Sequence, residues 1–192
     1  MSKNDDIQIE EIVDQVVSRL MGSLMDMPPA VPQAKGELTI GITTSGEKVA
    51  IGADHGGFLM KENLKTYLNE KGYTVVDCGT NGTDSVDYPD FARAVAEKVA
   101  NGEAWRGIMI DGAGIGSCMA ANKVQGIRAA MCYDYATAHN AREHNNANLL
   151  TLGAGLIGPN LAQQIVLTFL ETEFGGGRHA RRVDKIMQIE KE

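Results

Sequence analysis

Hydrophobic residues form five short runs in the chain, and stretches with the three- and four-residue spacing of amphipathic helices lie between them. The runs cover residues 49–53, 73–78, 107–111, 126–131 and 148–153. Short continuous apolar runs are typical of strands that are buried on both faces of a parallel sheet. The alternation therefore predicts an α/β fold, a three-layer αβα Rossmann-like doubly wound sheet of about five parallel strands.

The predicted helices follow the strands one by one. They cover residues 58–72, 90–103, 117–124, 135–145 and 160–174. Residues 181–192 are predicted to form a last helix, on the surface or across a subunit interface. Because ligands of doubly wound sheets bind at the carboxyl ends of the strands, the residues after each strand are the candidates for chemistry.

The first 48 residues lack this alternation. Residues 1–27 are predicted to form an amphipathic helix, because apolar residues recur there at helical steps. These residues are Ile9, Ile12, Val13, Val16, Val17, Leu20 and Leu24. Residues 28–48 contain three closely spaced prolines and a short strand-like segment, which predicts a linker. The helix either packs on its own domain or a sister subunit, or it is a docking peptide for another surface.

Composition narrows the class of protein. The net charge of -7 argues against a nucleic-acid partner, since an acidic surface repels phosphates. Three cysteines without metal-ligand spacing argue against a disulfide framework or a zinc site, and fit a reducing cytoplasm. Apolar runs are too short for a membrane helix, and the first residues are too acidic for a secretory peptide. We therefore expect a cytoplasmic protein without a membrane partner.

Two predicted strands end in residues that can do chemistry. Asp54 and His55 follow the first strand and place a carboxylate and an imidazole at the ligand edge; alternatively they are a helix cap and a surface histidine. Asp111 follows the third strand and opens the glycine-rich segment 112–116. Glycines at alternate positions allow backbone N–H groups to converge on an anion or oxyanion, although a tight turn alone also needs glycine.

Later in the chain, His144 ends a predicted helix beside amide side chains, where an imidazole serves as acid or base near neutral pH. Arg178 and Arg182 belong to a dense basic cluster after three consecutive glycines. Guanidinium groups match phosphate oxygens in shape and charge. The cluster predicts a phosphorylated small molecule as ligand; the alternative is a solvated basic turn that pairs with the acidic surface.

Five motifs, taken in order, resemble the type B ribose-5-phosphate isomerase family, which includes galactose-6-phosphate isomerase subunits. The motifs are ADHGG at 53–57, DYPDFA at 87–92, GAGIG with AANKV at 112–124, AREHNNAN at 141–148 and GGRHARRVDKI at 176–186. The resemblance covers residues 49 to about 187, so that residues 49–192 form the expected sugar-phosphate isomerase domain with its C-terminal helix.

The resemblance implies an aldose–ketose isomerisation through an enediolate, without metal or organic cofactor. It assigns ring opening to Asp54 and His144, and substrate contacts to Tyr88 and Asn145. The residues implied for the anion hole are Gly112, Ala113, Gly114, Ile115 and Gly116, and those for the phosphate are His55, Arg178 and Arg182. It also implies a homodimer or dimer of dimers, in which each site takes residues from two subunits.

The chain departs from the family pattern in the glycine loop and after it. Asp111 stands where many members have the cysteine base, and Ala113 replaces a threonine. A desolvated aspartate is a competent base, so we expect Asp111 to take that role, with Cys118 as the other candidate. Gly155 replaces an arginine usually near the phosphate. The alternative function is a non-catalytic or partner-dependent sugar-phosphate-binding subunit.

The N-terminal helix and tether are similar to the encapsulation peptides that direct enzymes into bacterial microcompartments. This similarity is one of form, a short helix with aliphatic pairs on a proline-rich tether. It implies a shell protein as the partner of residues 1–27 and a location inside a bacterial microcompartment. A dehydrogenase is disfavoured, because the turn after the first strand lacks the dinucleotide-binding glycines.

Overall fold

The computed structural model describes residue 15 and residues 47–191 of the chain. The chain divides into two units, residues 1–41 and 42–192, and the second is described here. Apart from Gln15, which is helical and exposed, the predicted N-terminal helix lies outside the described residues. The predicted linker lies outside them as well, except for its last two residues.

Five strands and six helices alternate along residues 47–191. The strands are β1 (Lys48–Ala53), β2 (Thr74–Asp77), β3 (Arg106–Asp111), β4 (Ala129–Met131) and β5 (Leu149–Gly153). The helices are α2 (Phe58–Glu70), α3 (Tyr88–Ala100), α4 (Ile115–Ala121), α5 (Tyr135–Glu143), α6 (Pro159–Glu171) and α7 (Arg178–Ile189). Each predicted strand and helix of this region is present.

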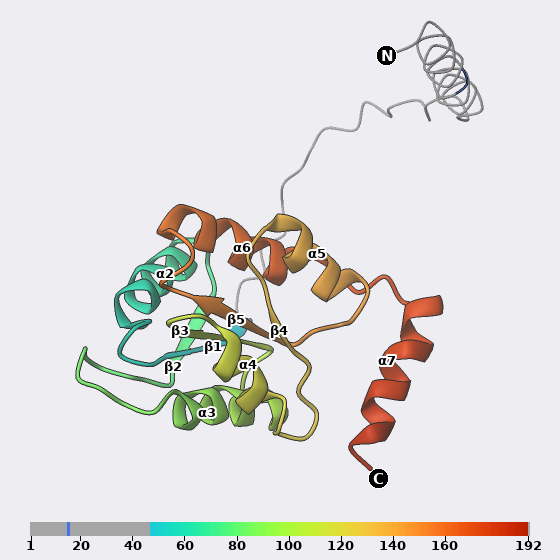
Figure 1. Cartoon of the computed structure of the whole chain (residues 1–192), viewed down its shortest axis with the longest axis horizontal. Helices are drawn as coiled ribbons and strands as arrows, with labels where there is room; N and C mark the ends of the chain where they lie inside the picture. The colour runs from blue at the N-terminus through green and yellow to red at the C-terminus, as the bar shows by residue number, and fades with distance from the viewer. Residues whose placement is uncertain (1–14, 16–46, 192) are drawn as a thin grey trace, which may run out of the picture. The chain divides into compact units, whose positions relative to one another are not determined.

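The strands form one parallel sheet in the order β2-β1-β3-β5-β4. Helices α2, α5 and α6 cover one face and α3 and α4 cover the other (Figure 1). Strand β2 lies on one side of β1 and strand β3 lies on the other, so the strand order changes direction at β1. Strands β1 and β3 are therefore neighbours in the middle of the sheet. Because β1 and β3 pair from Val49 with Arg106 to Ala53 with Ile110, their carboxyl ends lie side by side.

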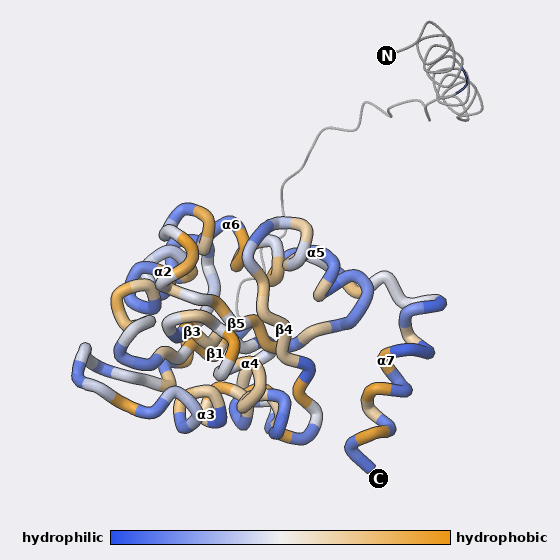
Figure 2. Tube along the Cα trace, viewed as in Figure 1, coloured by the Kyte–Doolittle hydropathy of each residue, from blue (hydrophilic) through white to orange (hydrophobic). Residues whose placement is uncertain are grey.

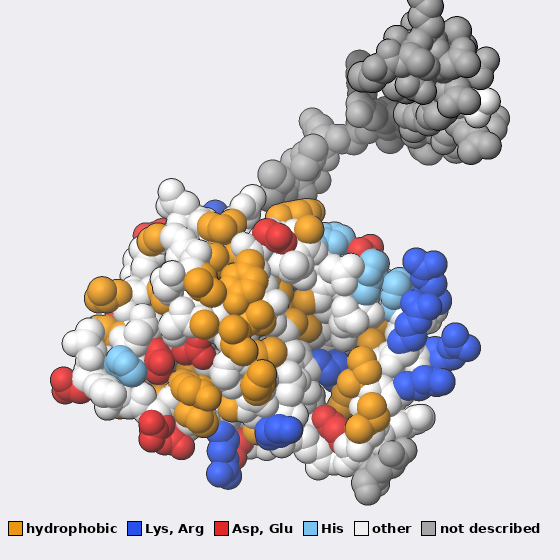
Figure 3. Space-filling view, in the orientation of Figure 1, with side chains coloured by type: hydrophobic (Ala, Val, Ile, Leu, Met, Phe, Trp, Pro, Cys, Tyr) orange, Lys and Arg blue, Asp and Glu red, His pale blue; other side chains and the backbone are white. Residues whose placement is uncertain are grey.

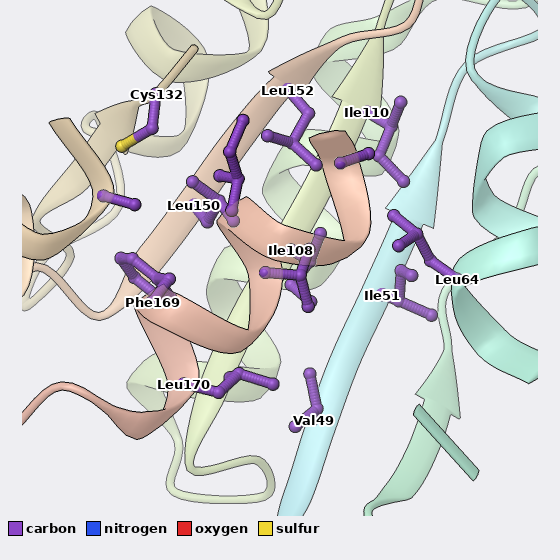
Figure 4. Packing of buried hydrophobic residues seen from close by; sticks show 14 of the residues in the cluster. Val49, Ile51, Leu64, Ile108, Ile110, Cys132, Leu150, Leu152, Phe169 and Leu170 are labelled. Carbon is purple, nitrogen blue, oxygen red and sulfur yellow. The ribbon is translucent and has the colours of Figure 1, made fainter. Parts of the chain in front are cut away.

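Alternate side chains of each strand enter different hydrophobic layers. Ile51, Ile108 and Leu150 point toward α6 (Figure 4), whereas Ala50 and Met109 pack on the side of α3. Both sets are fully buried, which explains why these strands lack polar alternation. The hydropathy colouring shows the same arrangement, with hydrophobic strands inside and hydrophilic helix surfaces outside (Figure 2). None of the described helices is long and apolar enough to cross a membrane.

Helix α7 lies at the side of the sheet layers (Figure 1) and buries little. Val183 is its one buried residue, while Ile186 and Ile189 are 46% and 69% exposed. Near its end, the Glu190 carboxylate accepts a hydrogen bond from the Gly126 N–H at 3.0 Å. The helix begins at Arg178, three residues earlier than predicted, directly after the glycine run. Its first turn therefore carries the arginine cluster.

Candidate active site

Asp111, the last residue of β3, is 5% exposed and accepts four hydrogen bonds. Its Oδ1 atom accepts from the N–H groups of Ala113, at 2.8 Å, and Gly114. Its Oδ2 atom accepts from the Ser117 N–H at 3.1 Å and from the Ser117 hydroxyl. An ionised carboxylate offers about four lone-pair positions. All of them are therefore occupied by the protein itself.

These bonds reduce the number of N–H groups that the predicted anion hole can offer to a ligand. The N–H groups of Ala113 and Gly114 are taken by the Asp111 carboxylate and do not face a ligand. The N–H groups of Gly112, Ile115 and Gly116 have no acceptor among the described residues. That the segment forms an anion hole stays a prediction, for which three free N–H groups remain.

The glycine loop is held from several sides. The Tyr133 hydroxyl donates to the Ala113 carbonyl at 2.8 Å, and the Thr151 hydroxyl donates to the Gly114 carbonyl at 2.8 Å. The Gly155 N–H donates to the Gly112 carbonyl at 3.0 Å. A Cβ atom at Gly155 would lie only 2.9 Å from that oxygen. The side chain missing at Gly155 thus allows its backbone to support the loop directly.

Asp54 and His55 lie beside this loop, in the turn after β1. The Asp54 N–H donates to the Ile110 carbonyl at 3.1 Å, which ties the turn to the end of β3. Asp54 is 7% exposed, and its Oδ1 atom accepts from the Gly57 N–H at 2.9 Å. His55 is exposed, and its Nδ1 atom accepts from the Val86 N–H at 3.3 Å. The Nε2 atom of His55 therefore carries the proton when the ring is neutral.

Tyr88 begins α3 and lies against the glycine loop. A Cβ atom at Gly116 would lie 2.5 Å from the Cζ atom of the Tyr88 ring, so only glycine fits beneath it. The Tyr88 side chain is 39% exposed. The structure thus brings Tyr88 to the loop, where the sequence places it. We call Asp54, His55, Tyr88 and residues 111–116 the loop group.

The remaining predicted residues gather between α5 and α7. His144 caps the end of α5, and its ring stacks on that of His179 with centroids 4.2 Å apart and an interplanar angle of 4°. The His144 Nδ1 atom lies 2.9 Å from the Asn140 amide nitrogen, and Nε2 lies 3.3 Å from the Glu143 carboxylate. Asn145 donates to the Asn140 carbonyl at 3.3 Å.

Arg178 and Arg182 lie on the exposed first turns of α7, where Figure 3 shows positive side chains gathered beside histidines. The Arg178 Nε atom contacts the His179 ring at 3.4 Å. Desolvation, followed by repulsion from His144 and the two arginines, lowers the pKa of His179. We call His144, Asn145, Arg178 and Arg182 the arginine group.

The loop group and the arginine group do not meet within one chain. No hydrogen bond, ion pair or ring contact joins them among residues 47–191. In Figure 3, histidine side chains appear at opposite sides of the visible face. One copy of the chain therefore holds the predicted site residues in two separate groups.

Cys118, the second candidate for the base, is bonded toward the first residue of β4. Its thiol donates to the Ala129 carbonyl at 3.4 Å and lies 3.6 Å from the Asn122 amide nitrogen. Burial is the main cause that raises the pKa of Cys118, which disfavours the reactive thiolate. These contacts fit a helical cysteine packed toward β4.

Two residues were missed by sequence reasoning. Ser117, six positions after Asp111, supplies two of its four hydrogen bonds. Glu143 lies 3.3 Å from both His139 and His144. The six-residue spacing of Asp111 and Ser117 does not match the capping box, so no local signal points to Ser117. A histidine with a glutamate four residues later is a helix-face signal, but it is too common to single out Glu143.

The chain is similar to known sugar-phosphate isomerases. The family model described as Ribose/Galactose Isomerase matches residues 49–186. Ribose-5-phosphate isomerase B of Escherichia coli is 43% identical over 144 residues, which is 75% of this chain and 97% of that protein. D-erythrulose-4-phosphate isomerase of Pectobacterium atrosepticum is 45% identical over 139 residues, 72% of this chain and 91% of that protein.

Solved structures agree with this comparison. A ribose-5-phosphate isomerase B of Clostridium thermocellum is 54% identical, with a TM-score of 0.74, over 75% of this chain and 97% of that one. The Mycoplasma genitalium enzyme with bound ribulose-5-phosphate is 45% identical, with a TM-score of 0.73, over 77% of this chain and 98% of that one. Since the family match, the relatives and the fold coincide, the chain belongs to the ribose/galactose isomerase family.

Proposed function

We propose that the protein interconverts an aldose phosphate and a ketose phosphate by ring opening and proton transfer through an enediolate. The observation that carries this proposal is the loop group, in which free backbone N–H groups lie beside the buried Asp54 carboxylate. An enediolate needs donors for its oxygen and a base for its carbon-bound proton. The family membership supports the same class of reaction.

The arginine group supplies the other half of the reaction. Arg178 and Arg182 offer guanidinium groups to a phosphate, together with the outward Nε2–H of His55 from the loop group. His144 lies within hydrogen-bonding range of amide and carboxylate partners, which suits ring opening by acid–base catalysis. No residue is required to bind a metal or organic cofactor in this scheme.

The two separate groups support a shared active site between two copies of the chain, in a homodimer or a dimer of dimers. Co-expression of Asp54→Asn chains with chains carrying Arg178→Ala and Arg182→Ala tests this arrangement. Each parent loses activity, and a mixed dimer regains one intact site, so about a quarter of the wild-type activity returns. A co-expressed sample as inactive as its parents would show that each chain builds its own site.

Turnover of a panel of sugar phosphates tests the reaction itself. Pure full-length protein is incubated with tetrose, pentose and hexose phosphates, and the ketose formed is measured. We expect conversion of at least one member. Calorimetric binding without turnover would instead favour the non-catalytic or partner-dependent subunit, and turnover only after a second homologous chain is added would identify the partner-dependent form.

The assignment of the base to Asp111 stays a prediction, and the four hydrogen bonds on its carboxylate argue against it. To accept a proton from substrate, Asp111 must first give up a bond to Ala113, Gly114 or Ser117. A variant of Asp111 alone would lose activity whether Asp111 is the base or only supports the loop. Comparison with variants of Asp54 and Ser117 separates these two roles.

Residues 1–27 are proposed as a docking peptide for a microcompartment shell protein. The family match begins at residue 49, so this segment is separate from the isomerase domain. Fused to a fluorescent protein in a compartment-forming host, residues 1–27 should give compartment-sized foci. The variant Val16→Asp should disperse them, and Gln15→Asp, on an exposed position, should not. Diffuse fluorescence of the wild-type fusion would contradict docking.

A further inference from the structure

Asp111 is bonded like a structural cap rather than a proton acceptor. The same chain contains a close parallel in Asp134, which begins α5. Its carboxylate accepts from the Thr137 N–H at 2.7 Å and from the Thr137 hydroxyl at 2.9 Å. Asp111 makes the same pair of bonds to Ser117 and adds two loop N–H groups. Its carboxylate therefore sets the shape of the loop.

Asp54 has the acceptor capacity that Asp111 lacks. Its Oδ1 atom receives one hydrogen bond, from the Gly57 N–H at 2.9 Å. Its Oδ2 atom has no hydrogen-bond partner among residues 47–191 and keeps some contact with solvent, since it is not among the fully buried atoms that lack a partner. Asp54 is nevertheless 7% exposed, so the carboxylate is shielded from most of the solvent. A shielded carboxylate with free lone pairs is suited to take a proton from carbon.

The Asp54 carboxylate and the free Gly112 N–H also lie close to each other. A Cβ atom built on Gly56 would lie 3.3 Å from the Asp54 Oδ1 atom and 3.7 Å from the Gly112 nitrogen. The Asp54 carboxylate and the Gly112 nitrogen therefore lie on the same side of Gly56, as near neighbours. An oxyanion held by the Gly112 N–H would place the adjacent carbon near Asp54.

We propose that Asp54 is the general base of the isomerisation, and that Asp111 and Ser117 are positioning residues that hold the glycine loop. The proposal rests on the proposed function and assigns its central step. Asp54 removes the hydrogen on C2 of the open-chain aldose as a proton. The C–H electron pair forms the C1=C2 double bond, and the carbonyl pair moves onto O1 near the free loop N–H groups.

The second half of the step returns the proton. Asp54 delivers it to C1, the proton of the C2 hydroxyl passes to O1, and the C2–O bond becomes the ketose carbonyl. No oxidant, metal or cofactor enters, because one carbon of the sugar is oxidised as its neighbour is reduced. The carboxylate ends the cycle in its starting form.

The test compares Asp54→Asn, Asp111→Asn, Ser117→Ala and the double variant of Asp111 and Ser117 in the full-length protein. Turnover is measured in D₂O, with solvent deuterium at the sugar carbons followed by NMR. Asp134→Asn is the matched control, since it weakens the equivalent cap at α5. Asn at 54 still accepts from the Gly57 N–H, so the turn keeps its bond. Thermal unfolding and calorimetric binding of the sugar phosphate verify that each variant is folded.

Asp54→Asn is expected to lose about 10²-fold or more in kcat and in deuterium exchange, with sugar-phosphate binding retained. Asp111→Asn and Ser117→Ala should each lose roughly tenfold in kcat, with little change in KM. The double variant should lose no more than the worse single variant, because both side chains act through one loop. Asp134→Asn should keep its kcat even where its unfolding temperature falls.

Two results would overturn the proposal in different ways. A loss of about 10²-fold in Asp111→Asn, with Asp54→Asn near wild-type kcat, assigns the base to Asp111 and removes Asp54 from that role. Additive losses in the double variant show that Asp111 and Ser117 do not act as one unit. A wild-type chain that converts none of the sugar phosphates contradicts the proposed function itself, before any variant is compared.

Discussion

The loop group and the arginine group are built in opposite ways. The loop group lies at the ends of two central strands, with both carboxylates at most 7% exposed and the loop backbone bonded on several sides. The arginine group joins two residues at the end of α5 to α7, a helix that buries a single residue and contacts the domain through a ring stack and the Glu190–Gly126 hydrogen bond. The loop group is held in place by hydrogen bonds within the chain, which suits proton transfer. The arginine group is open, which suits capture of a charged group.

The variant with the largest expected effect on this difference lacks both arginines of the arginine group. Arg178→Ala with Arg182→Ala should lower kcat/KM by roughly 10²-fold, or about 3 kcal/mol, because charge-assisted bonds to phosphate are lost. Steady-state kinetics measures this, and the unfolding temperature should stay unchanged because both side chains are exposed. Arg93→Ala, which removes an exposed arginine paired with Glu97 at 2.7 Å, is the control. If Arg93→Ala lowers kcat/KM by as much as the double variant, Arg178 and Arg182 have no specific role in substrate binding.

The next test disturbs the loop group through its backbone. A Cβ atom at Gly57 would lie 2.4 Å from the Ile110 carbonyl oxygen, so Gly57→Ala forces the β1 turn away from β3. We expect a loss of about 2 kcal/mol in the free energy of unfolding, measured by denaturant titration. Gly82→Ala, where the new atom meets nothing within 4 Å, should change stability little. A stable Gly57→Ala protein would mean that the turn is not fixed.

A smaller effect comes from one loop hydrogen bond. Tyr133→Phe removes the hydroxyl that donates to the Ala113 carbonyl at 2.8 Å. The expected cost is about 1 kcal/mol in stability, accompanied by a lower kcat with unchanged KM. Tyr135→Phe, at an exposed tyrosine on α5, serves as the comparison. If both variants behave like wild type, the hydroxyl does not support the loop.

The smallest expected effect concerns protonation of His179 beside the arginine group. Because the pKa of His179 is lowered, its folded-state value lies below 6.5 and the unfolded chain binds more protons in that interval. The contribution to stability is present above pH 6.5 and falls as the pH drops toward the folded value. NMR titration of the His179 ring should show this midpoint. His144→Asn should raise it, and His55→Asn should leave it unchanged.

Much of the fold was predictable because buried parallel strands are short and uniformly apolar. All five strands were found, and α2 begins where its periodicity begins, at Phe58. Strand β4 was predicted from residue 126 but begins at Ala129, because Gly126 has a φ of 85° and its N–H pairs with Glu190. That contact joins residues 64 positions apart, and local patterns do not contain it.

The sequence motifs predicted that certain residues lie together, but not how they are bonded. The motifs identify Asp54, Tyr88 and the glycine loop, and the structure brings these together. The sequence does not reveal that Asp111 turns back onto its own loop, since that depends on the helical position of Ser117. It also does not reveal the stacking of His144 on His179, which requires the placement of α7. The sequence gives the residue type directly, whereas the direction of a side chain depends on tertiary packing.

The mutual bonding of Asp111 and Ser117 has an evolutionary consequence. Each side chain satisfies the other within a segment of seven residues, so a change at one position leaves an unpaired buried group at the other. Single substitutions here are therefore disfavoured, and the two positions should change together among homologous chains. An aspartate that opens the glycine loop, with a hydroxyl residue six positions later, becomes a two-letter signature for recognising a loop of this type from genome sequence alone.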